Sequence, residues 1–223
     1  MDIGKSLSYV FEDQDWIKKI LLGALIMLIP IFGAFALLGY GIAIVRNVMA
    51  GSSRPLPEWN DMGAFFMDGL KFWVVGVIYV LPVIIVACPV SLVWLLPALG
   101  GENEDLMGLL AGVSGILFAG FACLVSLYSI LVGLLSPMLQ VRFANTGDIG
   151  ACLKVGEIFK LTFANIGNII ISMVVMWIAS SIIISVVGSV TFGLLALPAS
   201  LYVTAAQSHL IGQIGRQADL SVA

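Results

Sequence analysis

The sequence predicts an all-α integral membrane protein with about six transmembrane helices, and three observations support this fold class. First, 61% of the 223 residues are hydrophobic and 10% are charged, whereas soluble proteins carry about 25% charged residues. Second, four stretches lack Asp, Glu, Lys and Arg, and each is long enough to cross the hydrocarbon core, which takes about 20 residues. Third, all ten basic residues can be placed on one side of the membrane. We therefore expect a single membrane domain in the cell membrane.

Residues 1–16 are predicted to form an amphipathic helix at the cytoplasmic membrane surface. Ile3, Leu7 and either Val10 or Phe11 fall on one helical face. This pattern is typical of a helix that lies in the plane of the lipid headgroups. The segment has no basic head followed by a cleavage site, so we do not expect a cleaved signal peptide.

Residues 17–49 are predicted to form a helical hairpin, although the neutral stretch 20–45 would also suit a single crossing. Charge placement favours the hairpin. If the chain turns back at Pro30, every basic residue lies on the cytoplasmic side, whereas a single crossing divides them between the two sides. The arms are short, so the hairpin either spans with Lys18 and Lys19 at the interface or is re-entrant. Both chain termini are then cytoplasmic.

Residues 50–71 are predicted to form a cytoplasmic elbow that continues into an interfacial helix. Two prolines impose an extended path, and Asn60 or Asp61 can cap the helix that follows. Trp59, Phe65 and Phe66 are expected to anchor the segment among the headgroups. We interpret the elbow as a rigid connection, and the alternative is a docking site for a partner or a lipid headgroup. Its candidate residues are Pro55, Pro57, Glu58 and Trp59.

Four further crossings are predicted, over residues 72–98, 106–141, 161–187 and 190–214. The second of them is longer than one crossing requires, and we expect one helix that projects beyond the lipid. The turn before it carries Glu102, Glu104 and Asp105, the only charges expected on the opposite side. We interpret this turn as solvated. A weakly bound cation is the alternative, but the spacing is not that of a calcium-binding loop.

The most specific pattern in the chain is a stripe of small residues along the helix predicted for 106–141. Every position of one heptad series is Gly, Ala or Ser, at alternating spacings of four and three residues. Small residues at this period let a second helix approach closely in a left-handed crossing. We expect the partner helix to belong to the same chain, and the alternative is a second copy or another membrane protein. The stripe consists of Gly108, Gly112, Gly115, Ala119, Ala122, Ser126, Ser129, Gly133 and Ser136.

Residues 146–160 are predicted to form a second interfacial helix. Its start, Asp148-Ile149-Gly150, repeats Asp2-Ile3-Gly4, and each copy precedes an apolar hairpin. The equivalent positions favour an internal duplication, which is common among transporter folds. The alternative is a chance match of three residues.

Several segments of the N-terminal half are recognisable together: Asp2–Leu7, Trp16–Lys19, Leu28–Pro30, Gly39-Tyr40, Arg46-Asn47 and Leu56–Trp59. They resemble a family of bacterial and archaeal multi-pass membrane proteins catalogued as domain of unknown function 4013. The resemblance is specific as far as Leu81, and after it Arg142-Phe143-Ala144 and the second Asp-Ile-Gly segment still fit. It implies a helical membrane fold and supplies no activity, ligand or catalytic residue.

The crossings contain none of the charged residues that most membrane chemistry needs. No Asp, Glu, Lys or Arg lies within a predicted crossing, which argues against a proton pump, a transporter of charged substrates and an intramembrane hydrolase. The three cysteines lack metal-ligand spacing, so we expect no metal and no cofactor. With 10 basic and 13 acidic residues, the chain has no basic surface for nucleic acid. Enzyme is the least favoured class.

Two functions stay open. We expect a non-catalytic protein that packs with, scaffolds or regulates a membrane partner or lipid, because the stripe and the elbow are packing features. The partner is then membrane lipid, another membrane protein or a second copy of the chain. The alternative is a channel or carrier for a neutral or apolar small solute, which the duplication and the helix-breaking prolines favour. Its first candidate site is the polar cluster of Gln207, Ser208, His209 and Gln213.

Overall fold

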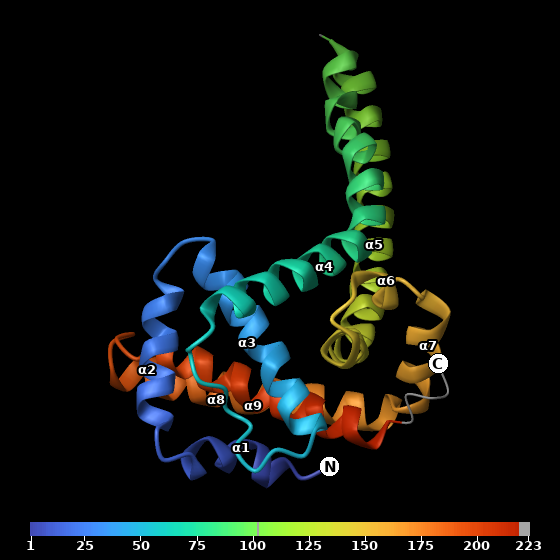
Figure 1. The fold of residues 1–223 in the computed structure, drawn as a ribbon. Helices are drawn as coiled ribbons and strands as arrows, with labels where there is room; N and C mark the ends of the chain where they lie inside the picture. Colours follow the sequence, from blue (N-terminus) through green and yellow to red (C-terminus); the bar gives the residue numbers. More distant parts are fainter. Residues whose placement is uncertain (102, 219–223) are drawn as a thin grey trace. The chain divides into compact units, whose positions relative to one another are not determined.

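The computed structural model describes residues 1–101 and 103–218, and every regular element within these ranges is a helix. Figure 1 shows their arrangement. The predicted all-α class is therefore confirmed. Glu102 of the predicted acidic turn lies outside the described residues. In chain order the helices are α1 (Ile3–Glu12), α2 (Trp16–Met27), α3 (Phe32–Met49), α4 (Met62–Ser91), the 3₁₀ helix η1 (Leu92–Gly100), α5 (Glu104–Thr146), α6 (Ile149–Cys152), α7 (Val155–Ala164), α8 (Ile166–Val190) and α9 (Ala196–Gln217).

The chain divides into two compact units. Unit 1 comprises Met1–Val75 and the chain from Leu134 onwards, and unit 2 comprises Gly76–Gly133. The helices α4 and α5 each contribute one part to unit 1 and one part to unit 2. Each unit has its own internal contacts.

Among the described residues, four helical segments are long and apolar enough to cross a membrane: Phe32–Met49, Met62–Leu99, Glu104–Thr146 and Ile166–Val190. The predicted count of six crossings is not confirmed. With 12 residues, α2 is about 18 Å long, which is less than the roughly 30 Å hydrocarbon core. The second half of α9 carries Gln207, Ser208, His209, Gln213 and Arg216, so only its first half is apolar.

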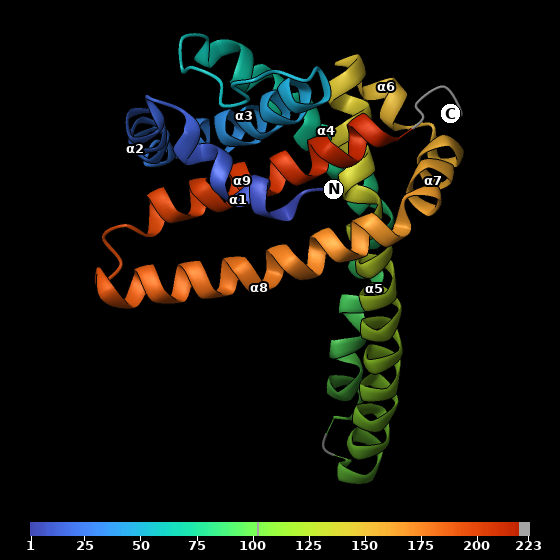
Figure 2. The ribbon, with the colours of Figure 1, turned by 90° about the horizontal axis from the view of Figure 1, so that it is seen from below.

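Unit 1 is built around α9. The α2–α3 hairpin packs against α9, and α8 runs antiparallel to it after a short turn (Figure 2). Tyr40 and Ile44 of α3 are buried in one core cluster with Leu201 and Ala205 of α9. The predicted turn at Pro30 is found, since α2 ends at Met27 and α3 begins at Phe32. The hairpin interpretation of residues 17–49 therefore agrees with the fold.

The helix α3 crosses the first turns of α4 at two glycines. A Cβ atom at Gly39 would overlap the carbonyl oxygen of Phe65, and a Cβ atom at Gly69 would overlap that of Phe35. The two backbones are in direct contact there, so no side chain fits at either position. This crossing holds the N-terminal part of α4 inside unit 1.

Two predicted boundaries differ from the structure. The predicted break between an interfacial helix and a span near residue 71 is absent, because α4 runs without interruption from Met62 to Ser91. The predicted interfacial helix 146–160 is instead two helices, α6 and α7, separated at Leu153 and Lys154. The two Asp-Ile-Gly segments do begin alike, since the side chains of Asp2 and Asp148 each cap a helix.

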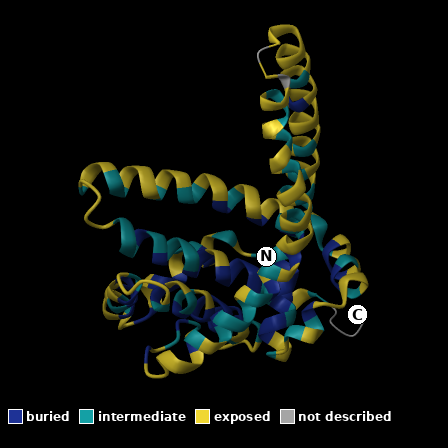
Figure 3. Ribbon diagram, turned by 90° about the horizontal axis from the view of Figure 1, so that it is seen from above, coloured by how far each residue is buried: buried dark blue, intermediate teal, exposed yellow. Residues whose placement is uncertain are grey.

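Unit 2 is a helical hairpin formed by the end of α4, η1 and most of α5. The hydroxyl of Tyr128 donates a hydrogen bond to the carbonyl oxygen of Tyr79 at 2.6 Å, and the rings of Trp94 and Phe118 meet edge to face at 5.2 Å. The long helix predicted from the stripe is found, because α5 continues through Pro137. Figure 3 shows that most residues of this hairpin are exposed, whereas the buried residues gather in unit 1.

Candidate functional site

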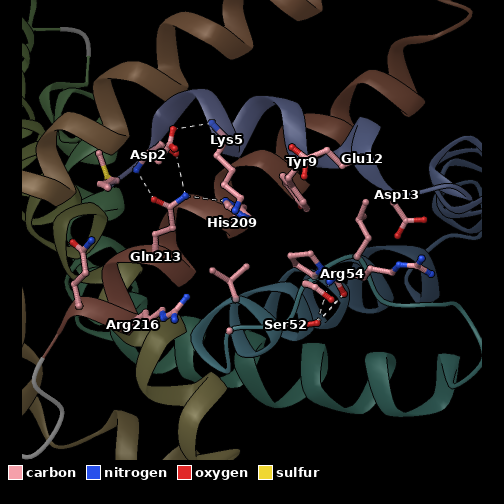
Figure 4. A pocket seen from close by; sticks show the side chains of 17 residues that line it. Asp2, Lys5, Tyr9, Glu12, Asp13, Ser52, Arg54, His209, Gln213 and Arg216 are labelled. Carbon is pink, nitrogen blue, oxygen red and sulfur yellow. Dashed lines mark hydrogen bonds between the residues drawn. The ribbon is translucent and has the colours of Figure 1, made fainter.

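The polar end of unit 1 contains a pocket of about 560 Å³. Its walls come from three parts of the chain: α1 with the residues beside it, the loop Gly51–Leu56, and the last turns of α9 (Figure 4). These parts are distant in sequence and meet only in the folded chain. We call this cavity the polar pocket, and it brings together one residue of the predicted elbow site, Pro55, and two of the predicted α9 cluster, His209 and Gln213.

The first wall exists because α1 docks on α9 through its N-terminus. The backbone N–H of Asp2 donates to Oε1 of Gln213 at 2.6 Å, and Nε2 of Gln213 donates to the carbonyl oxygen of Asp2 at 3.0 Å. Tyr9 and Val10 of α1 are buried, and the hydroxyl of Tyr202 in α9 donates to the carbonyl oxygen of Leu7 at 2.6 Å. The apolar face predicted to lie in the headgroups therefore packs largely on protein.

His209 lies buried beneath α1 and faces the polar pocket. Its ring stacks on Tyr9 at a centroid distance of 4.2 Å, and its Nδ1 is 2.8 Å from the hydroxyl of Ser6. Burial, reinforced by the positive charge of Lys5 and opposed by Asp2, lowers the pKa of His209 to about 4. The imidazole is therefore neutral near pH 7, and its role in the fold is to join α9 to α1.

A buried ion pair holds the Leu56 end of the loop Gly51–Leu56, which is the second wall of the pocket. Nζ of Lys19 lies 2.7 Å from Oδ2 of Asp13 and donates to the carbonyl oxygen of Leu56 at 3.1 Å. Burial raises the pKa of Asp13, but hydrogen bonds from Lys19 and the Asp15 backbone, with the charges of Lys19 and Arg54, bring it below its usual value. Lys19 was expected at the lipid interface, and the structure places it inside the protein instead.

The elbow packs onto the α2–α3 hairpin. Trp59 is only 6% exposed, stacks on Tyr40 at 4.2 Å, and donates from Nε1 to the carbonyl oxygen of Lys19 at 2.9 Å. The prediction that Trp59 and Phe65 anchor among headgroups is therefore wrong, because both are buried against the ring of Tyr40 in α3. An aromatic belt and an aromatic core have the same sequence signature.

Carbonyl groups of the elbow accept hydrogen bonds from α3. Nδ2 of Asn47 donates to the carbonyl oxygen of Pro55 at 2.9 Å, and the hydroxyl of Tyr40 donates to that of Pro57 at 3.2 Å. Glu58 points elsewhere and accepts from Nδ2 of Asn60 at 2.7 Å. The extended path predicted from the prolines is thus held at each step by a side chain of the hairpin.

The α9 cluster predicted from the sequence is divided between two faces of the helix. His209 and Gln213 line the polar pocket. Ser208 is buried on another face, where its Oγ lies 3.0 Å from the position of a Cβ on Gly41, and Gln207 is exposed. The four residues therefore do not form one site.

Three cations line the polar pocket without a charged partner. The side chains of Lys5, Arg54 and Arg216 face this cavity, and within the described part of the chain no carboxylate lies within ion-pair distance of any of them. The acidic lining residues are Asp2, Glu12 and Asp13. Of these, Asp13 is neutralised by Lys19, and Asp2 caps α1 by accepting from the Lys5 backbone N–H at 2.9 Å.

The small-residue stripe lies on the outside of unit 2. Its residues from Gly108 to Ser129 are exposed, and a Cβ atom at Gly108, Gly112 or Gly115 would meet nothing within 4 Å. In the hairpin, α5 instead turns Ser114 and Tyr128 inward. The partner helix expected from the same chain does not cover these glycines within unit 2.

The remaining predicted features bring no further chemical site together. Glu104 and Asp105 form the first turn of α5, where acidic side chains suit the helix dipole. Among the described residues, no group of three or more His, Cys, Asp or Glu side chains is placed to hold a metal ion.

Sequence reasoning missed several residues that build the site. Ser6, Tyr9, Asp13 and Tyr40 had no assigned role, yet each makes a buried polar or aromatic contact there. One signal was present for Asp13 and Lys19, because a charged pair next to an apolar run is compatible with burial if the two charges neutralise each other.

A family model described as a protein of unknown function (DUF4013) matches residues 22–198. This range is more than half of the 223 residues, so the chain belongs to the DUF4013 family, as the resemblance in its N-terminal half suggested. Comparisons with curated proteins and with solved structures found no match. The matched range includes the loop Gly51–Leu56 of the polar pocket and ends before His209.

Proposed function

We propose that this member of the DUF4013 family is a non-catalytic integral membrane protein whose unit 2 hairpin packs with a transmembrane helix of a second protein chain. The observation that carries the proposal is the outward-facing stripe of α5. In lipid, helices associate through close packing and hydrogen bonds more than through hydrophobic burial, and small residues permit the closest approach. A stripe of glycine, alanine and serine that no helix of unit 2 covers is suited to this approach.

The contrast among glycines supports the proposal. Where glycines serve contacts inside the chain, as at Gly39 and Gly212, an added Cβ would collide with a neighbouring helix. At Gly112 and Gly115 it would meet open space. A glycine inside a helix lowers the stability of the helix by about 0.5–1 kcal/mol relative to alanine. Close packing of the stripe against a helix of a second chain would offset this loss.

The proposed topology places the polar end of unit 1 in the cytoplasm. The two tips of unit 1, at Ile31 and Phe192, are apolar and exposed, whereas the basic residues Lys5, Arg54 and Arg216 meet at the polar pocket. This separation supports an arrangement in which the two hairpins of unit 1, α2–α3 and α8–α9, enter the bilayer from the side that carries the basic residues. We propose that α2–α3 is re-entrant, because α2 is too short to cross.

The topology is tested by labelling single cysteines in a cysteine-free background. Cysteines introduced at Lys18, Arg46, Lys71 and Arg216 should all react with a membrane-impermeant thiol reagent from the cytoplasmic side. A cysteine at Asn103 should react from the opposite side. Labelling of the Lys18 and Arg46 positions from opposite sides would disprove the hairpin orientation.

The carrier alternative receives less support from the geometry. The polar pocket is lined by charged residues, which does not suit a neutral or apolar solute. The centre of unit 1 is filled by Tyr40, Ile44 and Leu201, each fully buried. No specific observation favours a pathway for a solute, so we retain the packing function alone.

The packing function is tested with two differently tagged copies expressed together and purified from native membranes. We expect the tagged chain to bring down either the other copy or a second membrane protein, and Gly112→Leu to abolish this association. Ile116→Leu, exposed but off the stripe, is the matched control and should retain it. A wild-type chain that purifies alone, or equal association for both variants, would overturn the proposal.

A further inference from the structure

We propose that the polar pocket is a binding site for a phosphate-bearing anion, either the headgroup of an anionic phospholipid or a soluble phosphate compound. This inference goes beyond the packing function proposed for unit 2 and does not depend on it. It rests on the shape of the cavity, on the charges that face it and on the parts of the chain that build it.

The cavity has the size and the lining of a small-ligand site. At about 560 Å³, it lies within the range of about 300–1,000 Å³ that is usual for ligand pockets. Tyr9, Val48 and Leu56 give it an apolar base, since all three are buried. Ser52 and Ser53 of the loop add hydroxyl groups to the same cavity. Apolar surface with a few converging polar groups is the usual composition of such a site.

The cations of the pocket outnumber the carboxylates that have no paired cation. Lys5, Arg54 and Arg216 have no ion-pair partner in the described part of the chain, and of the three lining carboxylates Asp13 is paired with Lys19, which leaves Asp2 and Glu12. The ammonium and guanidinium groups offer several N–H donors each and no acceptor, which is the chemistry that phosphate oxygens require. Unpaired cations around a cavity are electrostatically costly, and an anion would remove this cost.

Glu12 does not cancel this preference. Its carboxylate accepts only a long hydrogen bond of 3.5 Å from Ser8. In Figure 4 it lies at the Asp13 end of α1, away from Arg216. An anion that binds between α1 and the end of α9 would therefore face cations first. The arginine of the loop, Arg54, is placed on the Asp13 side, where it balances the carboxylates.

The three cations come from α1, from the Gly51–Leu56 loop and from α9. No single segment of the chain forms the pocket, so binding of an anion would join the N-terminal and C-terminal helices to the elbow. A free phosphate compound and a lipid headgroup offer the same recognised group, and they differ in the tail that the lipid leaves in the bilayer.

The inference is tested with the full chain in nanodiscs, by comparing a triple variant with a charge-matched control. The pocket variant is Lys5→Gln, Arg54→Gln, Arg216→Gln. The control is Lys18→Gln, Lys71→Gln, Lys160→Gln, whose residues do not line the pocket and which changes the net charge by the same amount. Retained lipid is measured by native mass spectrometry after incubation with phosphatidylglycerol or phosphatidylcholine, and soluble binding by calorimetry with pyrophosphate in phosphatidylcholine nanodiscs.

We expect one of the two phosphate sources to bind the wild-type chain and the control, and to bind the pocket variant at least about tenfold more weakly. Retention of phosphatidylglycerol over phosphatidylcholine identifies a lipid headgroup, and binding of pyrophosphate identifies a soluble ligand. Equal weakening in the two triple variants, or no binding of either probe to the wild type, would overturn the inference. Gly112→Leu should bind as the wild type does, which separates this test from that of the packing function.

Discussion

Both units of the chain are rich in apolar residues, and they use them differently. Unit 1 buries its apolar residues between its own helices and adds buried polar contacts such as Asp13 with Lys19 and Ser6 with His209. Unit 2 leaves large apolar side chains such as Ile116 and Leu124 exposed by 76% and 68%. Most of unit 2 lies within the candidate spans Met62–Leu99 and Glu104–Thr146. In the 18-residue apolar window of these spans, 11% and 0% of the residues are buried.

The difference shows where each unit finds its stabilisation. Unit 1 has an internal core of its own, so local changes there should alter its stability. Unit 2 has one surface where its two helices meet and one outward surface. Substitutions on the outward surface should therefore change the contacts of unit 2 with lipid or with another chain and leave the packing inside it unchanged. The following predictions test this separation, and backbone hydrogen exchange in detergent, read region by region, measures it directly.

The largest effect is expected from breaking the buried ion pair of unit 1. Lys19→Met leaves the carboxylate of Asp13 buried without its cation, and such a loss typically costs about 3–5 kcal/mol. Exchange should accelerate in α1, α2 and the elbow, while unit 2 should remain protected. Lys154→Met is the matched control, because the Lys154–Glu157 pair is exposed and is worth less than about 1 kcal/mol. Equal effects of the two variants would contradict this account.

The docking of α1 on α9 should weaken in acid. His209 is neutral when folded, with a pKa of about 4, and titrates near 6.5 when unfolded. Its contribution to stability is therefore complete above pH 6.5 and falls as the pH drops towards 4, by about 3 kcal/mol in total. The protection factors of the α1 amides, which correct for the pH dependence of intrinsic exchange, should fall across this interval. His209→Gln should flatten the dependence of α1 protection on pH. The charged or titratable neighbours Asp2, Lys5 and Tyr9 are unchanged in this variant, so any pH dependence that remains comes from groups other than His209. A profile that the variant leaves unchanged would exclude His209 as the cause.

Alanine substitutions at two glycines should act in opposite directions. Gly39→Ala forces a methyl group against the backbone of α4, and overpacking of this kind costs about 1–3 kcal/mol. Gly112→Ala meets open space and should stabilise the isolated chain by about 0.5–1 kcal/mol through helix propensity. Thermal unfolding in detergent, followed by circular dichroism, gives the sign of each change. Destabilisation by Gly112→Ala in the isolated chain would mean that a helix of the same chain covers the stripe.

The smallest effect is expected within the hairpin of unit 2. Tyr128→Phe removes the hydrogen bond to the carbonyl oxygen of Tyr79 and should cost about 1 kcal/mol. Exchange should increase in the amides near this contact and stay unchanged in unit 1. An increase in the core of unit 1 would show that the two units do not respond separately.

The features that the sequence predicted best are those that depend on period and charge. The turn at Pro30 followed from placing all basic residues on one side, and the length of α5 followed from nine small residues at one period. Asp61 was one of two candidate caps, and it accepts from the Ala64 backbone N–H at 3.0 Å. Each of these inferences needs only the order of residues along the chain and no contact between distant segments.

The features that the sequence could not predict are those in which protein replaces lipid. Trp59 and the apolar face of α1 would suit a headgroup layer as well as a protein core, because both environments favour the same side chains. The count of six crossings is not confirmed, and a scan for charges treats Gln207, His209 and Gln213 as neutral although they belong to the polar half of α9. Only contacts between distant segments distinguish these cases.

The contact between α1 and α9 also bears on the order of events during synthesis. The backbone of Asp2 pairs with Gln213, which is 211 residues away, so unit 1 cannot close until nearly the whole chain has been made. At about 5–20 residues per second, α1 waits roughly 10–40 s for its partner. The hairpin of unit 2 connects nearby segments and can assemble during this interval. The hairpin of unit 2 is therefore complete before α9, which closes unit 1, has been made.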